Sequence, residues 1–309
     1  MKIVFMGTPD FAVSTLRALI ANHDVLGVFT QPDKFVGRHH VLTPPPVKVC
    51  AEENGITVYQ PNTLRDGKAL EILKELSPDA IVVVAYGKIL PTEILEFPKY
   101  GCINIHASLL PKLRGAAPIQ WSIVSGEEKT GITTMYMNDG IDTGDMLQTA
   151  ETVIEEDDNF ESLHDRLSLM GADLIIKTLK ALEDGTAIRT VQDEASATYA
   201  PIIKKEMGCI DFTKTATEIR NLVRGFDPWP SAYTFWNGKR LKVMSAKVME
   251  NKVNLEPATV CSTDGGIYVA CGEGTVLLLD KVQLEGSKAM QSSELLRGHK
   301  IEKGMKLGE

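Results

Sequence analysis

The chain lacks the features that mark exported or membrane-bound proteins and proteins that are stabilised by disulfides or metal ions. Its first apolar run, residues 3–6, is followed at once by Gly7-Thr8-Pro9-Asp10, and it is far shorter than a signal-peptide core or a membrane span. The five cysteines are odd in number, scattered and free of any C-x-x-C pair, which argues against a disulfide framework or a zinc site. We therefore expect a cytoplasmic protein with reduced, buried thiols, no membrane partner and no bound metal.

Positive charge is also scarce. The formal net charge is −8, whereas proteins that coat nucleic acid depend on clustered lysine and arginine. The average conceals a split, because residues 1–206 carry 19 basic and 29 acidic side chains, while residues 207–309 carry 14 and 12. The second part of the chain, with its slight positive balance, could therefore approach RNA more easily than the first.

What the sequence does contain is a long region of alternating strand and helix patterns. Short runs that are apolar on both faces are typical of a covered parallel sheet. The expected strands are residues 2–7, 25–30 and 80–87, and the expected helices are Phe11–Ala21, Val47–Asn54, Leu64–Leu76 and Asn159–Glu183. A length of 309 residues is more natural for two domains than for one. We predict an α/β fold whose first domain, residues 1–190, is a doubly wound, mostly parallel, Rossmann-like sheet.

The pattern changes after this region. Periodicity fades between Glu183 and Met207, which predicts an exposed linker over residues 191–206. Beyond it, one helical stretch, Thr215–Arg224, precedes short β-rich pieces that are separated by Gly, Asn and Pro turns. We predict a small, OB-like β-barrel domain over residues 207–309.

One strand pattern carries polar side chains that suit catalysis. In Cys102-Ile103-Asn104-Ile105-His106 polar and apolar residues alternate, so Asn104 and His106 project from the same face, about 6 to 7 Å apart along the chain. Ligands of open α/β sheets bind beyond the carboxyl ends of the strands, where His106 lies if the strand ends at Ala107. The alternative for this pair alone is an amide and an imidazole that are satisfied by loop hydrogen bonds.

Two loops complete the candidate site. The first, Ser108-Leu109-Leu110-Pro111-Lys112-Leu113-Arg114-Gly115, follows the strand and brings leucines and two cations to it. The second, Gly140-Ile141-Asp142-Thr143-Gly144-Asp145, follows another strand pattern and has the composition of a tight turn. Its D-T-G triplet also occurs in aspartic proteases, but their chemistry needs a second catalytic aspartate in a matching frame. The sequence contains no second D-T-G.

The strand and the first loop together read N-x-H-x-S-L-L-P-x-x-R-G, a pattern that closely resembles the signature of folate-dependent formyltransferases. The resemblance implies that 10-formyltetrahydrofolate donates a formyl group to an amine, that Asn104 donates a hydrogen bond to the oxyanion, and that Asp142 orients His106. Whether His106 acts mainly as a base or as an oxyanion donor stays open. The implied folate-contacting residues are Ser108, Leu109, Leu110, Pro111, Tyr86 and Gly87. Core packing is the alternative role for the two leucines.

The resemblance extends along nearly the whole chain. Four segments are similar to landmarks of methionyl-tRNA formyltransferases, namely Phe5-Met6-Gly7-Thr8-Pro9-Asp10-Phe11, Gly225-Phe226-Asp227-Pro228-Trp229-Pro230, Leu296-Arg297-Gly298 and Gly304-Met305-Lys306-Leu307-Gly308. Membership of that family implies formylation of methionyl-initiator-tRNA by an enzyme that we expect to be a monomer. Sugar-amine formyltransferases, which also carry a C-terminal domain, are the main alternative; the glycinamide ribonucleotide enzyme has no such domain. A dinucleotide-dependent dehydrogenase is the alternative from another class, but G-T-P-D-F-A lacks the second and third glycines of G-x-G-x-x-G.

The loop of residues 33–48 discriminates between these alternatives. It is basic, and it is long for a βα connection, which usually spans about 2 to 6 residues. The resemblance implies that this loop enters the acceptor end of a tRNA, with an arginine at Arg38, although the following His39 and His40 depart from the family's pattern. A mobile surface loop is the alternative. The expected tRNA contacts are Lys34, Arg38 and Lys48 here, and Lys239, Arg240, Lys242 and Lys247 in the second domain, where a solvated strand face is the alternative.

Overall fold

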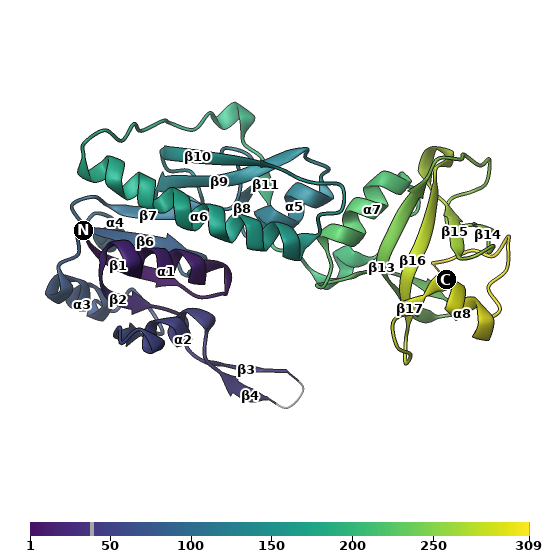
Figure 1. Ribbon diagram of the computed structural model, residues 1–309, viewed down its shortest axis with the longest axis horizontal. Coiled ribbons are helices and arrows are strands. Elements are labelled where there is room, and N and C mark those ends of the chain that lie inside the picture. The colour runs from purple at the N-terminus through teal and green to yellow at the C-terminus, as the bar shows by residue number, and fades with distance from the viewer. Residues whose placement is uncertain (38–39, 309) are drawn as a thin grey trace. The chain divides into compact units, whose positions relative to one another are not determined.

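The computed structural model describes residues 1–37 and 40–308, which divide into two compact units (Figure 1). Unit 1 comprises Met1–Pro118, Lys129–Val153 and His164–Ala200, and unit 2 comprises Ile119–Glu128, Ile154–Leu163 and Pro201–Glu309. The second unit therefore includes two segments from the middle of the chain, which the expected division into residues 1–190, 191–206 and 207–309 does not contain.

Unit 1 is built on a seven-stranded sheet of order β10-β9-β7-β6-β1-β2-β5. Its strands are β1 (Lys2–Gly7), β2 (Asp24–Phe29), β5 (Val58–Tyr59), β6 (Ala80–Val84), β7 (Cys102–His106), β9 (Lys129–Tyr136) and β10 (Met146–Val153). Neighbours from β5 to β7 are parallel, whereas β9 runs antiparallel to both β7 and β10. The predicted doubly wound, mostly parallel sheet is confirmed, with β10 as an edge strand that the sequence patterns did not predict.

Helices cover both faces of this sheet. They are α1 (Phe11–Asn22), α2 (Pro46–Glu53), α3 (Lys68–Leu76), α4 (Thr92–Leu95) and α6 (Phe160–Glu183). On one face Val4 and Met6 of β1 share an apolar cluster with Leu73 of α3 and Ile94 of α4. On the other face Gly171 of α6 lies against Ile105 of β7. The predicted helix Leu64–Leu76 is wrong at its start, because Gly67 adopts a left-handed φ of 81° immediately before α3.

Unit 1 also contains shorter elements between its main strands and helices. A hairpin joins β3 (Lys34–Val36) to β4 (Val41–Thr43), and β8 (Arg114–Gly115) pairs in parallel with β11 (Tyr199–Ala200). A short 3₁₀ helix, η1 (Glu194–Ser196), precedes β11. The predicted linker over residues 191–206 is mostly exposed, but Gln192, Ala200 and Ile203 within it are buried.

Unit 2 contains a curled antiparallel sheet with helices at its sides. Its strands follow the order β12-β13-β16-β15-β14, and β17 also pairs with β16. The strands are β12 (Ala232–Trp236), β13 (Lys239–Met249), β14 (Val260–Ser262), β15 (Ile267–Ala270), β16 (Val276–Leu284) and β17 (Met290–Gln291). The α-helices are α5 (Pro118–Val124), α7 (Ala216–Gly225) and α8 (Ser292–Gly298), and the 3₁₀ helices are η2 (Lys205–Gly208) and η3 (Gly272–Gly274). The predicted small β-barrel is thus confirmed as a half-barrel, whereas the expectation of one helical stretch is wrong because α8 is also present.

Helix α7 holds together the parts of unit 2 that are distant in sequence. The Arg224 guanidinium donates to the carbonyl oxygens of Glu155, Glu156 and Asp158 at 2.9, 3.3 and 3.2 Å. The Trp121 indole of α5 donates to the Pro201 carbonyl at 2.9 Å. Segments 119–128 and 154–163 are therefore integral parts of unit 2.

The prediction of buried thiols holds for only part of the set. All five cysteines are free, and Cys50, Cys102 and Cys271 are buried. Burial raises the pKa of the Cys102 thiol and that of the Cys271 thiol to about 12. The prediction is wrong for Cys209, which is exposed, and for Cys261, which is partly exposed.

This difference in exposure predicts selective thiol labelling. At pH 8 a maleimide should react with Cys209 first, because the thiolate is the reactive form and Cys209 is the exposed thiol. Mass spectrometry of peptides from a labelling time course measures the order. Cys209→Ser should remove the fastest phase, and labelling of Cys102 at the same rate as Cys209 in the folded protein would contradict the prediction.

Candidate active site

The candidate site begins on β7, where two polar side chains interrupt a buried strand. Ile103 and Ile105 point to the face that α6 covers, and both are buried. Asn104 and His106 alternate with them and so share the opposite face. His106 is 6% exposed at the carboxyl end of β7, and Asn104 is partly exposed. An amide and an imidazole thus lie beyond Cys102, the residue of this strand face that belongs to the apolar cluster with α3 and α4.

The imidazole of His106 has a hydrogen-bond partner at Nε2 and a carboxylate near Nδ1. Nε2 lies 2.9 Å from the carbonyl oxygen of Leu113, and because a carbonyl can only accept, Nε2 carries hydrogen and donates. Nδ1 lies 3.6 Å from Asp142 Oδ2, which is ion-pair distance but longer than a hydrogen bond. The structure therefore brings His106 and Asp142 together and determines the direction of the ring.

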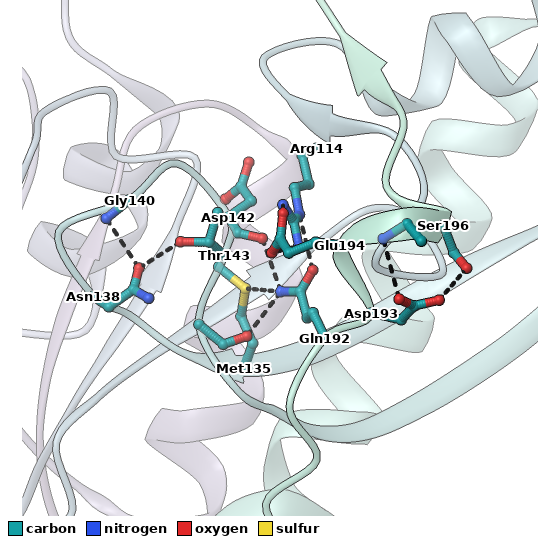
Figure 2. Close-up of polar contacts among 12 residues, drawn as sticks. Arg114, Met135, Asn138, Gly140, Asp142, Thr143, Gln192, Asp193, Glu194 and Ser196 are labelled. Atoms are coloured by element: carbon teal, nitrogen blue, oxygen red, sulfur yellow. Dashed lines mark hydrogen bonds and ion pairs between the residues drawn. The ribbon is translucent and has the colours of Figure 1, made fainter.

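Asp142 lies in the tight loop between β9 and β10. Its Oδ2 accepts a hydrogen bond from the Gly115 backbone at 2.9 Å. Across the loop, Asn138 accepts from the Gly140 backbone at 3.0 Å and from the Thr143 hydroxyl at 2.9 Å (Figure 2). A Cβ at Gly144 would lie 1.7 Å from the carbonyl oxygen of Tyr136, so no larger residue fits there. This packing explains why the second glycine of the G-I-D-T-G-D motif is a glycine.

The loop after β7 is held by a threonine that the sequence analysis missed. The Thr133 hydroxyl donates to the Ser108 carbonyl at 2.7 Å and accepts from the Leu110 backbone at 3.1 Å. Ser108 Oγ donates to the Lys112 carbonyl at 2.6 Å, so its hydroxyl is used within the loop. Leu110 is buried, whereas Leu109 is partly exposed. Pairing of Thr133 with His106 across β9 and β7 places it here, and no motif in the sequence marks it.

The loop after β6 lies beside the end of β7, since the two strands are parallel neighbours. Ala85 and Gly87 have positive φ values of 46° and 81°, and the Tyr86 carbonyl accepts from the Thr8 hydroxyl and the Gln31 amide. Tyr86 packs in the apolar cluster of unit 1, and burial raises its pKa to about 12. With the Tyr86 side chain buried, this loop therefore offers mainly its backbone and Gly87 to a ligand at the end of β7.

The predicted tRNA contacts lie on separate elements. Arg38 and His39 fall outside the described residues. Lys34 is exposed on β3, while Lys48 of α2 forms an ion pair with Asp33 at 2.9 Å. Four apolar side chains of the hairpin are more than half exposed, namely Phe35, Val36, Val41 and Leu42.

In unit 2 the predicted basic residues lie along β13. Lys239 and Arg240 are exposed and Lys242 is partly exposed. The Arg240 guanidinium lies 4.5 Å from the ring centroid of Tyr233 on β12, which is cation–π distance. Lys247, further along, lies 3.5 Å from an Asp280 carboxylate oxygen.

Metal sites and membrane-spanning helices are absent from the part of the chain that the structure describes. Within residues 1–37 and 40–308 no group of three His, Cys, Asp or Glu side chains could hold a metal ion. None of the helices in the same ranges combines the length and the apolar character that crossing a bilayer requires.

Comparison with known proteins identifies the family. The chain matches the model of the formyl transferase family over residues 1–179, and that of the formyl transferase C-terminal domain over residues 202–300. The chain therefore belongs to the formyl transferase family, as the N-x-H signature predicts. It is 52% identical to the methionyl-tRNA formyltransferase of Caldanaerobacter subterraneus, with 98% of this chain and 99% of the relative covered. It is 50% identical to the methionyl-tRNA formyltransferase of Clostridioides difficile over the full length of both chains.

Solved structures share the fold at lower identity. The sugar 3N-formyl transferase WlaRD, crystallised with dTDP and 5-N-formyl-THF, has a TM-score of 0.69 at 19% identity and covers 93% of this chain and 99% of its own. The N-formyltransferase of Helicobacter canadensis, in complex with folinic acid and dTDP-3-aminofucose, has a TM-score of 0.68 at 20% identity and covers 90% and 98%. At these identities the likeness supports the fold alone.

Proposed function

We propose that this enzyme transfers the formyl group of 10-formyltetrahydrofolate to the amino group of methionyl-initiator-tRNA. The observation that carries the proposal is the identity of 52% and 50%, over both domains, to relatives named methionyl-tRNA formyltransferase. In this reaction the methionine nitrogen attacks the formyl carbon, and a tetrahedral intermediate forms. The bond from that carbon to the folate N10 then breaks, and the proton lost by the amine is returned to N10.

The candidate site supplies the groups that this reaction needs. Asn104 donates a hydrogen bond to the oxyanion, a type of contact whose loss costs about 10²–10³ in kcat in other enzymes. His106 moves the proton or adds a second donor to the oxyanion, and Asp142 orients it. The 3.6 Å separation of His106 Nδ1 and Asp142 Oδ2 supports this pairing.

We assign the folate to the loops beside β7 and the tRNA to basic side chains of both units. The loop of residues 108–111 and the loop around Gly87 flank the folate, and Leu109 offers an accessible apolar side chain to its rings. Folate compounds in the solved WlaRD and Helicobacter canadensis enzymes support a folate donor.

The acceptor end of the tRNA contacts three basic residues of unit 1, Lys34, Arg38 and Lys48. The tRNA phosphates contact three basic residues of unit 2, Lys239, Arg240 and Lys242. We further propose that the enzyme acts as a cytoplasmic monomer.

A direct assay tests the function. Purified protein, 10-formyltetrahydrofolate and charged methionyl-initiator-tRNA should give N-formylmethionyl-tRNA and tetrahydrofolate, with the formylated amino acid detected after mild base hydrolysis. A parallel reaction with an amino-sugar nucleotide should give no product. Formylation of the sugar nucleotide, with methionyl-tRNA left untouched, would instead assign the enzyme to the sugar-amine formyltransferases.

A further inference from the structure

A buried glutamine outside the signature motifs touches the loop that carries Asp142. Gln192 lies after α6 and is 5% exposed. Its Nε2 atom donates to two carbonyl oxygens, those of Asp142 and Gly144, both at 2.8 Å. Figure 2 shows this amide directed at the Asp142 loop from the segment that also carries Asp193 and Glu194. The segment expected to link two domains therefore contributes a contact to the candidate site.

Arg114 determines which way the Gln192 amide faces. Arg114 Nε donates to Gln192 Oε1 at 2.9 Å. A rotated amide would turn its NH₂ group toward this N–H donor and its oxygen toward two carbonyls, so only one orientation satisfies all three partners of the amide. The Gln192 side chain is thus locked in the orientation that holds the Asp142 loop.

The buried Arg114 side chain is held in turn by the exposed side chain of Glu194. The Arg114 side chain is 0% exposed, and its two terminal nitrogens donate to the two oxygens of Glu194 at 2.9 and 2.8 Å. The Arg114 hydrogen bonds lower the pKa of Glu194, and the same contact raises the pKa of Arg114. The bidentate pair therefore keeps a buried guanidinium charged and fixed.

These contacts form a closed ring around Asp142. Its backbone carbonyl is held by Gln192, and its carboxylate accepts from the backbone of Gly115, the residue that follows Arg114. Leu113, on the other side of Arg114, holds His106 Nε2. One tripeptide, Leu113–Gly115, therefore contacts both members of the His–Asp pair, and Gln192 connects its arginine to the aspartate.

The backbone conformation of Asp142 also calls for such support. Its φ is +53°, in the left-handed region that few residues other than Gly, Asn and Asp adopt. Conformations of this kind persist when the surroundings determine them. A displacement of about 1 Å at a catalytic group can lower the rate by 10²-fold, and the carboxylate stands only 3.6 Å from His106 Nδ1.

We propose that Gln192 is a positioning residue for formyl transfer, which acts through Asp142 and depends on Arg114 for its own orientation. This inference rests on the proposed function for the identity of the reaction. It assigns to Gln192 no contact with either substrate. Loss of the Gln192 amide should therefore lower kcat and leave the KM of each substrate nearly unchanged.

Two substitutions test the positioning role. In Gln192→Glu a carboxylate oxygen replaces Nε2 and faces the two carbonyls, and in Gln192→Met both hydrogen-bonding groups are absent. We expect kcat to fall by about 10- to 100-fold in each variant, with KM for the folate and for methionyl-tRNA within about threefold of the parent. Ser196→Ala is the matched control, because Ser196 lies in the same segment and its hydroxyl contacts Asp193 instead of the Asp142 loop. Its kcat should match that of the parent.

A double mutant separates positioning from general destabilisation. If Gln192 acts through Asp142, adding Gln192→Met to Asp142→Ala should lower kcat no further than Asp142→Ala alone. Normal kcat in both Gln192 variants, or a fully multiplicative loss in the double mutant, would overturn the proposal. Circular dichroism melting of each variant gives the folded fraction to which kcat is normalised, and a loss that this correction removes would also overturn it. Failure of the parent to formylate methionyl-tRNA would count against the proposed function instead, and the same ratios would then be measured on the amine that the parent does formylate.

Discussion

Alanine at Asn104, His106 or Asp142 should in each case lower kcat for formyl transfer by about 10²-fold or more. In the proposed mechanism Asn104→Ala removes the oxyanion donor, and His106→Ala removes the group that moves the proton or adds a second donor to the oxyanion. Asp142→Ala removes the carboxylate that lies 3.6 Å from the ring and orients it. Single-turnover assays with saturating folate and methionyl-tRNA measure the chemical step. Circular dichroism should show that each variant is folded, because these side chains contribute little to the apolar clusters.

The matched control and the pattern among the variants make this expectation specific. Asn22→Ala removes another asparagine, one whose amide donates to the Ala18 carbonyl at 2.8 Å on α1, and it should retain full activity. The pair His106→Ala and Asp142→Ala should be non-additive, because members of one catalytic unit fail together. Near-parental turnover of any of the three single variants would remove that residue from the mechanism.

Reversing the charge of Lys239 and Arg240 together should raise KM for methionyl-tRNA by about 10-fold or more and leave KM for the folate unchanged. Each phosphate contact that is lost weakens binding in a salt-dependent way and reduces the slope of log affinity against log salt by about one. Both side chains are exposed on β13, so the substitution should not disturb the core of unit 2. Initial rates at several salt concentrations measure both quantities.

The control for this double variant is an equal change of charge elsewhere. Lys177 and Lys180 are exposed on α6 of unit 1, and their reversal alters the net charge by the same amount. If the β13 variant has the parental KM for methionyl-tRNA, or if KM rises equally in both double variants, then β13 does not bind tRNA and its basic side chains form an ordinary solvated face. Formylation of the sugar nucleotide would be the next assay in that case.

Local patterns predicted the parts of the fold and the candidate site that depend on neighbours in sequence. Alternation in Cys102-Ile103-Asn104-Ile105-His106 predicted β7 with its bounds, and the apolar runs predicted the parallel core of the sheet. The long stripe of α6 was predicted to within one residue. The resemblance to folate-dependent formyltransferases predicted that Asp142 belongs with His106, although only the fold brings two residues so far apart in sequence to within 3.6 Å.

The remainder depends on contacts that no local pattern encodes. Gln192 and Asp142 are 50 residues apart, and a single polar residue in an irregular segment gives no periodic signal. Edge strand β10 has one buried residue, Leu147, and polar side chains at four of its eight positions. Helix α8 has seven residues, which is too short for a stripe to be recognised. Each of these features is determined by its partners in space.

The composition of unit 2 has a consequence for how the protein is made. Segment 154–163 gives its carbonyl oxygens to Arg224, which follows them by 66 to 69 residues. At ribosomal rates of about 5–20 residues per second, roughly 3 to 14 seconds separate the synthesis of the two partners. During that time the carbonyl oxygens of Glu155, Glu156 and Asp158 lack their guanidinium partner. Folding of unit 2 therefore cannot be completed in the order of synthesis, and a chain that ends before α7 keeps this segment without the contact that joins it to the rest of unit 2.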